Sequence, residues 1–144
     1  MEIKIRLNDH KYRYDVYQMF NIYFALDELK FVDDGEYIIN IEENKITFAF
    51  NGYYKESLIG ENIKEDIKRL VFESLKDITG EEHPWGILVG IRPSKIALKY
   101  LNEGKSNEEI VEIFKEKHLA AREKAELCIE VAKAEESFVN TDEK

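Results

Sequence analysis

The sequence predicts an α+β fold, a ferredoxin-like βαββαβ sandwich followed by a small all-helical C-terminal part. Three observations lead to this prediction. Runs of alternating apolar and polar residues are separated by longer runs with helical spacing, in the order strand, helix, strand, strand, helix, strand. Two strand–helix–strand units around a central hairpin are typical of the ferredoxin-like sandwich. After residue 91 the spacing of apolar residues is helical throughout.

The first half of the sandwich begins with a strand and a helix. Residues 2–7 alternate so that Ile3, Ile5 and Leu7 share one face, as in a strand with one buried side. Residues 12–29 follow helical spacing and carry many aromatic side chains. Aromatic residues at helical spacing usually build core, so we expect this face to pack on the sheet rather than to bind a ligand.

A hairpin follows this helix. Residues 36–42 and 45–50 both alternate, and the connection between them is short enough for a hairpin. Asn51 and Gly52 either start a second hairpin strand over 53–59 or mark a bulge in one long strand. The sequence leaves both alternatives open.

The second half of the sandwich is a helix and a strand. Residues 61–78 place apolar side chains on one stripe and charged side chains mostly outside it, and Gly80 follows as a stop signal. Residues 87–91 form a short apolar run, which predicts a buried last strand. We therefore assign residues 1–91 to the sandwich.

Helices are predicted after the sandwich. Pro93 suits the first turn of a helix, because its missing N–H costs nothing there. Ser106 and Glu109 have the spacing of a capping box, which starts the next helix. A helical extension is therefore assigned to residues 92–139, and the polar residues 140–144 are expected to fray.

The composition excludes several classes of protein. The chain has 144 residues, of which 44% are hydrophobic and 35% are charged, as expected of a globular protein with a real core. No apolar run reaches the roughly 18–20 residues of a membrane span, so no membrane partner is expected. The single cysteine, Cys128, allows no internal disulfide and fits a cytoplasmic protein. A net charge of −9 opposes binding to phosphate backbones, so nucleic acid is not an expected partner.

No catalytic, cofactor-binding or metal-binding residue is predicted from the motifs of the chain. The histidines His10, His83 and His118 are far apart in the sequence, and Cys128 has no cysteine neighbour. The sequence contains no glycine-rich phosphate or dinucleotide loop and no serine nucleophile motif. The acidic pair at 135–136 is interpreted as a solvated helix face.

The remaining candidate site is the corner at 90–95, which reads GIRPSK and joins the predicted strand to the predicted helix. A helix N-terminus suits an anion, and Arg92 can bind a carboxylate or a phosphate with two hydrogen bonds. Arg92, Ser94 and Lys95 are therefore candidate anion contacts. Alternatively they form a structural or interdomain contact, in which Arg92 pairs with an acidic side chain of this or a neighbouring domain. One point counts against a ligand: cations at a helix start are unfavourable unless something negative lies there.

The segment 85–96 resembles part of a known family. It reads WGILVGIRPSKI and is similar to the W-G-I-L-x-G-I-R-P-[ST]-K segment of oxygen-independent coproporphyrinogen III oxidase-like radical SAM proteins, of the coproporphyrinogen dehydrogenase HemZ type. In that family the segment lies in an N-terminal region, before the radical SAM barrel. Residues 101–119 also resemble that region, whereas the first 80 residues resemble it only in the order of their elements.

The resemblance implies a non-catalytic N-terminal accessory domain, whose partner is the C-terminal radical SAM domain of the same chain. In that family the chemistry belongs to a C-x-x-x-C-x-x-C loop that holds a [4Fe–4S] cluster and cleaves S-adenosylmethionine. The present sequence contains no such loop, so no catalytic or cofactor residue is carried over. The parent protein is expected to be an oxidoreductase of porphyrin and haem biosynthesis, which decarboxylates the propionates of coproporphyrinogen III oxidatively.

The alternative is a free-standing ferredoxin-like module that binds RNA or a protein partner. Sandwiches of this kind bind RNA through aromatic and basic side chains on the sheet. Tyr37, Phe48 and Phe50 are the aromatic candidates of the predicted hairpin, and their alternation places them more naturally in the core.

Overall fold

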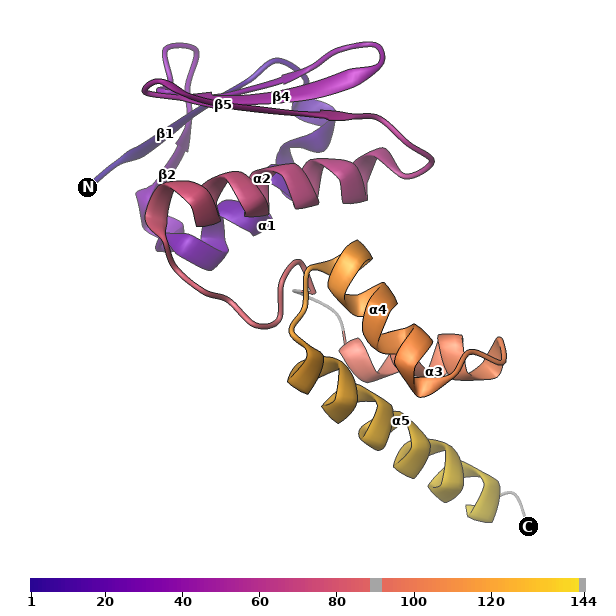
Figure 1. Ribbon diagram of the computed structural model, residues 1–144. Helices are drawn as coiled ribbons and strands as arrows, with labels where there is room; N and C mark the ends of the chain where they lie inside the picture. Colours follow the sequence, from indigo (N-terminus) through magenta and orange to yellow (C-terminus); the bar gives the residue numbers. More distant parts are fainter. Residues whose placement is uncertain (89–91, 143–144) are drawn as a thin grey trace. The chain divides into compact units, whose positions relative to one another are not determined.

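The structure, a computed structural model, describes residues 1–88 and 92–142 (Figure 1). The chain forms two compact units, Met1–Glu82 and His83–Lys144. Over the described residues, the first unit contains a five-stranded mixed sheet and two α-helices, and the second contains three α-helices. The predicted α+β class is therefore confirmed.

The sheet of the first unit has its N-terminal strand in the interior. The strands are β1 (Ile3–Leu7), β2 (Leu29–Phe31), β3 (Tyr37–Ile41), β4 (Lys45–Phe50) and β5 (Tyr53–Leu58). Their order across the sheet is β2-β1-β3-β4-β5. β1 is parallel to both of its neighbours, whereas β3, β4 and β5 form an antiparallel meander. The sheet is therefore built outward from β1 in both directions.

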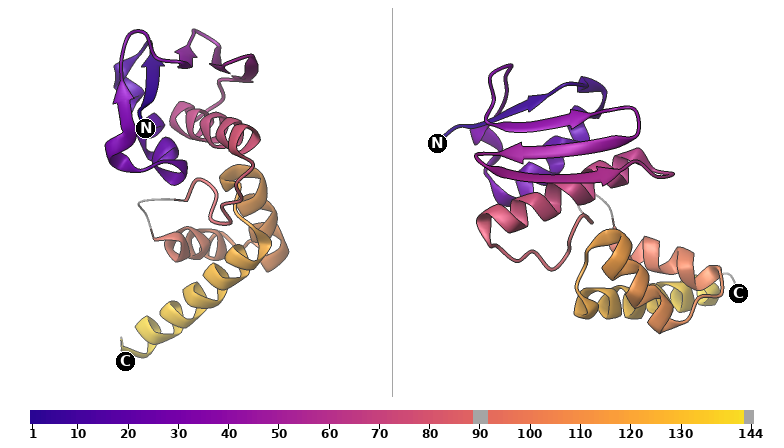
Figure 2. Two further views of the ribbon diagram at one scale, coloured as in Figure 1. Left: turned by 90° about the vertical axis from the view of Figure 1, so that its left-hand side faces the viewer. Right: turned by 45° about the horizontal axis from the view of Figure 1, so that its top comes forward.

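Two helices cover one face of this sheet (Figures 1 and 2). They are α1 (Arg13–Tyr23), which follows a 3₁₀ turn at His10–Tyr12, and α2 (Ile63–Thr79). Phe20 of α1 lies 5.3 Å from the ring of Tyr37 and 6.2 Å from the ring of Phe48, measured between centroids. All three side chains are buried. Phe20 therefore builds core, as the sequence predicts for the aromatic face of this helix.

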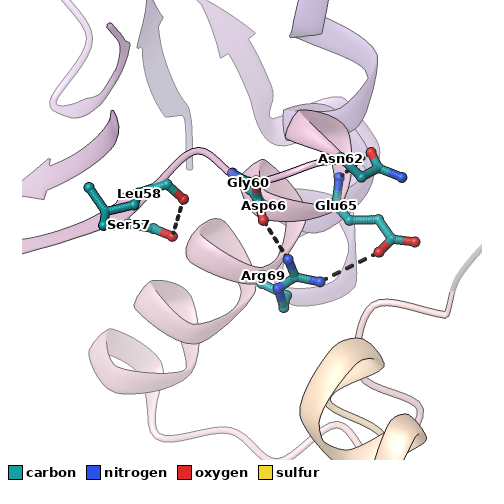
Figure 3. A network of polar contacts seen from close by, with 7 residues as sticks. All are labelled: Ser57, Leu58, Gly60, Asn62, Glu65, Asp66 and Arg69. Carbon is teal, nitrogen blue, oxygen red and sulfur yellow. Dashed lines mark hydrogen bonds and ion pairs between the residues drawn. The ribbon is translucent and has the colours of Figure 1, made fainter. Parts of the chain in front are cut away.

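The start of α2 is held by a network of polar contacts (Figure 3). Asn62 caps the helix by accepting a hydrogen bond from the amide of Glu65 at 3.2 Å. The buried carboxylate of Asp66 accepts a hydrogen bond from the amide of Gly60 at 2.7 Å. The guanidinium of Arg69 pairs with Asp66 and also lies 3.5 Å from Glu65. These carboxylates sit in the first turn, where the helix dipole favours negative charge, so the network has a structural role.

The two hairpins of the sheet settle an alternative that the sequence leaves open. The first hairpin joins β3 to β4, as predicted. The second joins β4 to β5 through Asn51 and Gly52, whose φ angles are 46° and 90°. Two consecutive residues with positive φ are the geometry of the tightest hairpin turns, which match the twist of the strands. The hairpin alternative is therefore correct, and the bulge alternative is wrong.

The predicted helix over 12–29 is too long. α1 ends at Tyr23, because Phe24 adopts an extended backbone with φ −132° and ψ 151°. The chain then makes a 3₁₀ turn at Leu26–Glu28 and enters β2, where Leu29 is buried and pairs with Ile3. A strand of three residues is too short to show an alternating pattern. Hydrogen bonding along the edge of β1 overrides the apolar spacing that suggested a longer helix.

The ferredoxin-like order is not confirmed. It requires a last strand after α2, which the sequence predicts over 87–91. Ile87 lies in a turn and Leu88 in no regular element, and residues 89–91 lie outside the described residues. Leu88 is buried within the core of the helical unit. A short apolar run does not distinguish a buried strand from a buried turn, and here Leu88 packs among helices.

The chain crosses β1 between β2 and β3. Phe31 of β2 and Tyr37 of β3 both pair with Ile5, from opposite sides of β1. The connecting segment passes so close that a Cβ at Gly35 would lie 2.6 Å from the carbonyl carbon of Ile5 and 2.7 Å from the amide nitrogen of Arg6. Such distances are below van der Waals contact, so the crossing accommodates glycine alone.

Three helices make up the described part of the second unit. They are α3 (Pro93–Asn102), α4 (Asn107–His118) and α5 (Arg122–Asp142). The predicted capping box is confirmed: the hydroxyl of Ser106 accepts a hydrogen bond from the amide of Glu109 at 3.2 Å, and the carboxylate of Glu109 accepts one from the amide of Ser106 at 3.0 Å. Part of the segment predicted to fray is helical, because α5 continues through Asp142.

A turn before α3 lies against the end of α4. The amide of Ile87 donates a hydrogen bond to the carbonyl of His118 at 2.9 Å, and the amide of Ala121 donates one to the carbonyl of Pro84 at 2.8 Å. Gly86 lies between these contacts with φ 59°, and a Cβ there would lie 2.2 Å from the carbonyl oxygen of His118. The close approach of the two segments therefore depends on glycine at this position.

Candidate functional site at the start of α3

The three candidate residues of the corner lie at the start of α3 in different surroundings. Arg92 is the N-cap residue of the helix, and Pro93 follows in its first turn. The side chain of Arg92 is 67% exposed, Ser94 is only 5% exposed, and Lys95 is exposed. The rest of the corner, residues 90–91, lies outside the described residues.

Glu135 of α5 contacts two of the candidates. Its Oε2 atom lies 3.4 Å from Nη2 of Arg92, and its Oε1 atom accepts a hydrogen bond from the hydroxyl of Ser94 at 3.4 Å. A carboxylate is favourable at this position, since the helix N-terminus carries a partial positive charge. Arg92 and Ser94 are thus arranged around an anion that the chain itself supplies, and together they tie the start of α3 to α5.

Lys95 takes no part in this contact. It lies beside a shallow basin along the outer face of α3, with a volume of about 1040 Å³. The residues that line the basin include the charged residues Arg92, Lys95, Lys99 and Glu103 and the apolar residues Ile96 and Leu98. Neither Lys95 nor Lys99 forms an ion pair with any residue that the structure describes. The two ammonium groups are one helical turn apart on the same face, so they repel each other.

The other candidate groups have structural surroundings. The ring of His118 packs edge-on against Phe114, with a centroid distance of 5.6 Å. Cys128 is buried, and burial raises the pKa of its thiol, which keeps the group protonated and a poor nucleophile. Across residues 1–88 and 92–142, no group of three or more His, Cys, Asp or Glu is placed to hold a metal ion. Over the same residues, no helix is both long enough and apolar enough to cross a membrane.

Sequence reasoning missed Glu135 as the partner of the corner. The sequence indicates a solvated surface for the acidic pair at 135–136, which is wrong for Glu135, because its carboxylate contacts Arg92 and the buried Ser94. The contact joins residues 41 positions apart. No local motif marks such a pair, since the spacing depends on how α3 and α5 pack.

Glu135→Ala is expected to lower the free energy of unfolding of the helical unit by about 1–2 kcal/mol, because it leaves the buried hydroxyl of Ser94 without its acceptor. Urea unfolding followed by the fluorescence of Trp85, the only tryptophan, reports on this unit. The matched control is Glu116→Ala, which removes an exposed acid of α4 that has no ion pair among the described residues. Equal urea midpoints for the two variants would show that the corner contributes nothing to stability.

Comparisons of the chain with models of protein families, with curated proteins and with solved structures find no match. The resemblance carried by residues 85–96 therefore stays a prediction.

Proposed function

We propose that this chain is a non-catalytic N-terminal accessory domain of a radical SAM enzyme that resembles oxygen-independent coproporphyrinogen III oxidase. The observation that carries the proposal is the segment 85–96, WGILVGIRPSKI. The enzyme acts in porphyrin and haem biosynthesis in the cytoplasm. Its [4Fe–4S] cluster and S-adenosylmethionine belong to the C-terminal radical SAM domain, which is the partner of this chain.

The surroundings of this segment support a structural rather than a catalytic use of its residues. Trp85 packs against the core of the helical unit, with the ammonium of Lys124 5.2 Å from the centre of its ring. Gly86 permits the close approach to α4, and Arg92 contacts Glu135. Residues that hold a folded unit together are expected wherever the same unit occurs. The similar segment of the radical SAM family therefore points to a similar helical unit in that family.

The proposal is tested by the gene and by the metal content of the encoded protein. The reading frame that contains these 144 codons is expected to continue into a C-x-x-x-C-x-x-C loop. After anaerobic reconstitution, the full-length protein is expected to bind iron and sulfide in the stoichiometry of one [4Fe–4S] cluster, whereas residues 1–144 alone bind neither.

Two results would contradict the proposal. The first is a reading frame without the three-cysteine loop, because the protein would then lack the radical SAM domain that we propose as the partner. Stoichiometric uptake of iron and sulfide by residues 1–144 alone would place a cluster in the segment that we propose to be accessory. As a control for intact folding, the Trp85 fluorescence of residues 1–144 is compared before and after the reconstitution.

A further inference from the structure

Helix α5 has a second apolar stripe, on the side opposite to the core. Its core-facing residues are buried, among them Ala125, Cys128, Ile129 and Ala132. Leu127 and Val131 lie outside that face and are 44% and 38% exposed. In the sequence, Ala134 and Phe138 continue the same spacing, at i+7 and i+11 from Leu127. Apolar residues alternately four and three apart are typical of a face that packs against another helix.

Acidic residues accompany this stripe. Glu123 and Glu130 are exposed, lie on the same side of α5 as Leu127 by helical spacing, and form no ion pair with any described residue. If the stripes of two copies packed on each other, these carboxylates would be brought together and would repel. The partner face is therefore expected to be apolar with basic residues beside it.

The outer face of α3 in the same unit is partly apolar and carries basic residues. Lys95 and Lys99 line the basin there without an ion pair among the described residues, and Ile96 and Leu98 supply apolar surface. The repulsion between the two ammonium groups is relieved when carboxylates from outside approach them. The helical unit therefore carries two exposed faces of opposite charge, each apolar in part.

We propose that the chain forms a dimer in which the Leu127–Val131 stripe of α5 in one copy occupies the basin along α3 of the other copy. Glu123 and Glu130 then face Lys95 and Lys99 across the contact. Two copies related by a two-fold axis make this contact twice, which closes the assembly. The inference concerns the helical unit alone and does not depend on the proposed function.

Sedimentation equilibrium over a wide range of protein concentrations tests the apolar half of the contact. The wild-type chain is expected to dimerise reversibly. Leu127→Glu combined with Val131→Glu is expected to raise the dissociation constant about tenfold or more, since it places charges in the centre of the contact. The matched control is Leu58→Glu, which changes an apolar residue of the first unit that is 76% exposed and leaves the dissociation constant unchanged.

A charge swap tests which faces meet. Lys95→Glu/Lys99→Glu in one variant, and Glu123→Lys/Glu130→Lys in another, are each expected to weaken self-association. Their mixture is expected to associate about tenfold more tightly than either variant alone, because opposite charges face each other in both contacts of the mixed dimer, whereas like charges face each other in both contacts of either variant alone. All of these substitutions are at exposed positions, so far-ultraviolet circular dichroism and Trp85 fluorescence should match the wild type.

Three results would overturn the proposal. The first is a wild-type chain that stays monomeric at every concentration. The second is a dimer that tolerates the Leu127→Glu/Val131→Glu change as well as it tolerates Leu58→Glu. The third is a mixture of the charge-swap variants that associates no better than its components, which would show that α3 and α5 do not face each other.

Discussion

Gly35→Ala is expected to lower the free energy of unfolding of the first unit by about 3 kcal/mol or more. The added methyl group would lie 2.6 Å from the carbonyl carbon of Ile5 and 2.7 Å from the amide nitrogen of Arg6. Both atoms belong to the backbone of an inner strand, which is hydrogen-bonded on both sides and has little room to move. The clash is therefore relieved only by pushing the crossing segment away from β1.

The measurement for Gly35→Ala is urea unfolding followed by far-ultraviolet circular dichroism. Gly60→Ala is the matched control, because a Cβ at Gly60 would lie 3.6 Å from the carboxylate of Asp66, which is ordinary contact. Trp85 belongs to the second unit, so its fluorescence midpoint should not change. If Gly35→Ala unfolds at the same urea concentration as Gly60→Ala, the segment does not cross β1 as closely as described.

Gly86→Ala is expected to destabilise the helical unit by about 3 kcal/mol or more, from two sources. A left-handed backbone costs a residue with a Cβ about 1–2 kcal/mol, and Gly86 has φ 59°. The larger source is steric, because the Cβ would lie 2.2 Å from the carbonyl oxygen of His118 and 2.4 Å from the carbonyl carbon of Leu119. The expected result is a lower urea midpoint in Trp85 fluorescence.

Gly104→Ala separates these two sources. Gly104 also has a positive φ, 86°, and a Cβ there would meet no atom within 4 Å. The free energy of unfolding of this variant is therefore expected to fall only by the cost of the left-handed backbone, about 1–2 kcal/mol. If Gly86→Ala and Gly104→Ala lower the free energy of unfolding by the same amount, the turn before α3 does not pack against the end of α4.

The sequence was a good guide where a pattern is local and long. The alternation of Ile3, Ile5 and Leu7, the first hairpin and the helix that became α2 were all predicted, because each is specified by its own residues. The capping box at Ser106 and Glu109 was predicted for the same reason. Local hydrogen bonds and burial agree in these elements, so periodicity is sufficient to find them.

The sequence was a poor guide where distant segments decide the structure. β2 exists because the edge of β1 is available to it, and three residues carry no readable pattern. The apolar residues Ile87 and Leu88 indicate a strand, but Leu88 is buried in the core of the helical unit and Ile87 lies in a turn. At the candidate site, the position of Arg92 at a helix start can be predicted from the sequence, whereas its contact with Glu135 depends on the packing of α3 on α5.

The interior position of β1 also constrains the order of events during synthesis of the protein. β1 is made first, yet neither neighbour exists until residues 29–41 have followed it out of the ribosome. Both pairings are parallel and non-local, and such contacts form slowly because the intervening chain must first be closed into a loop. Before residues 29–41 are synthesised, α1 is the element that can pack against the apolar face of β1. During synthesis, α1 is thus the first element that can keep the apolar face of β1 from water, and the pairing of β1 with β2 and β3 follows later.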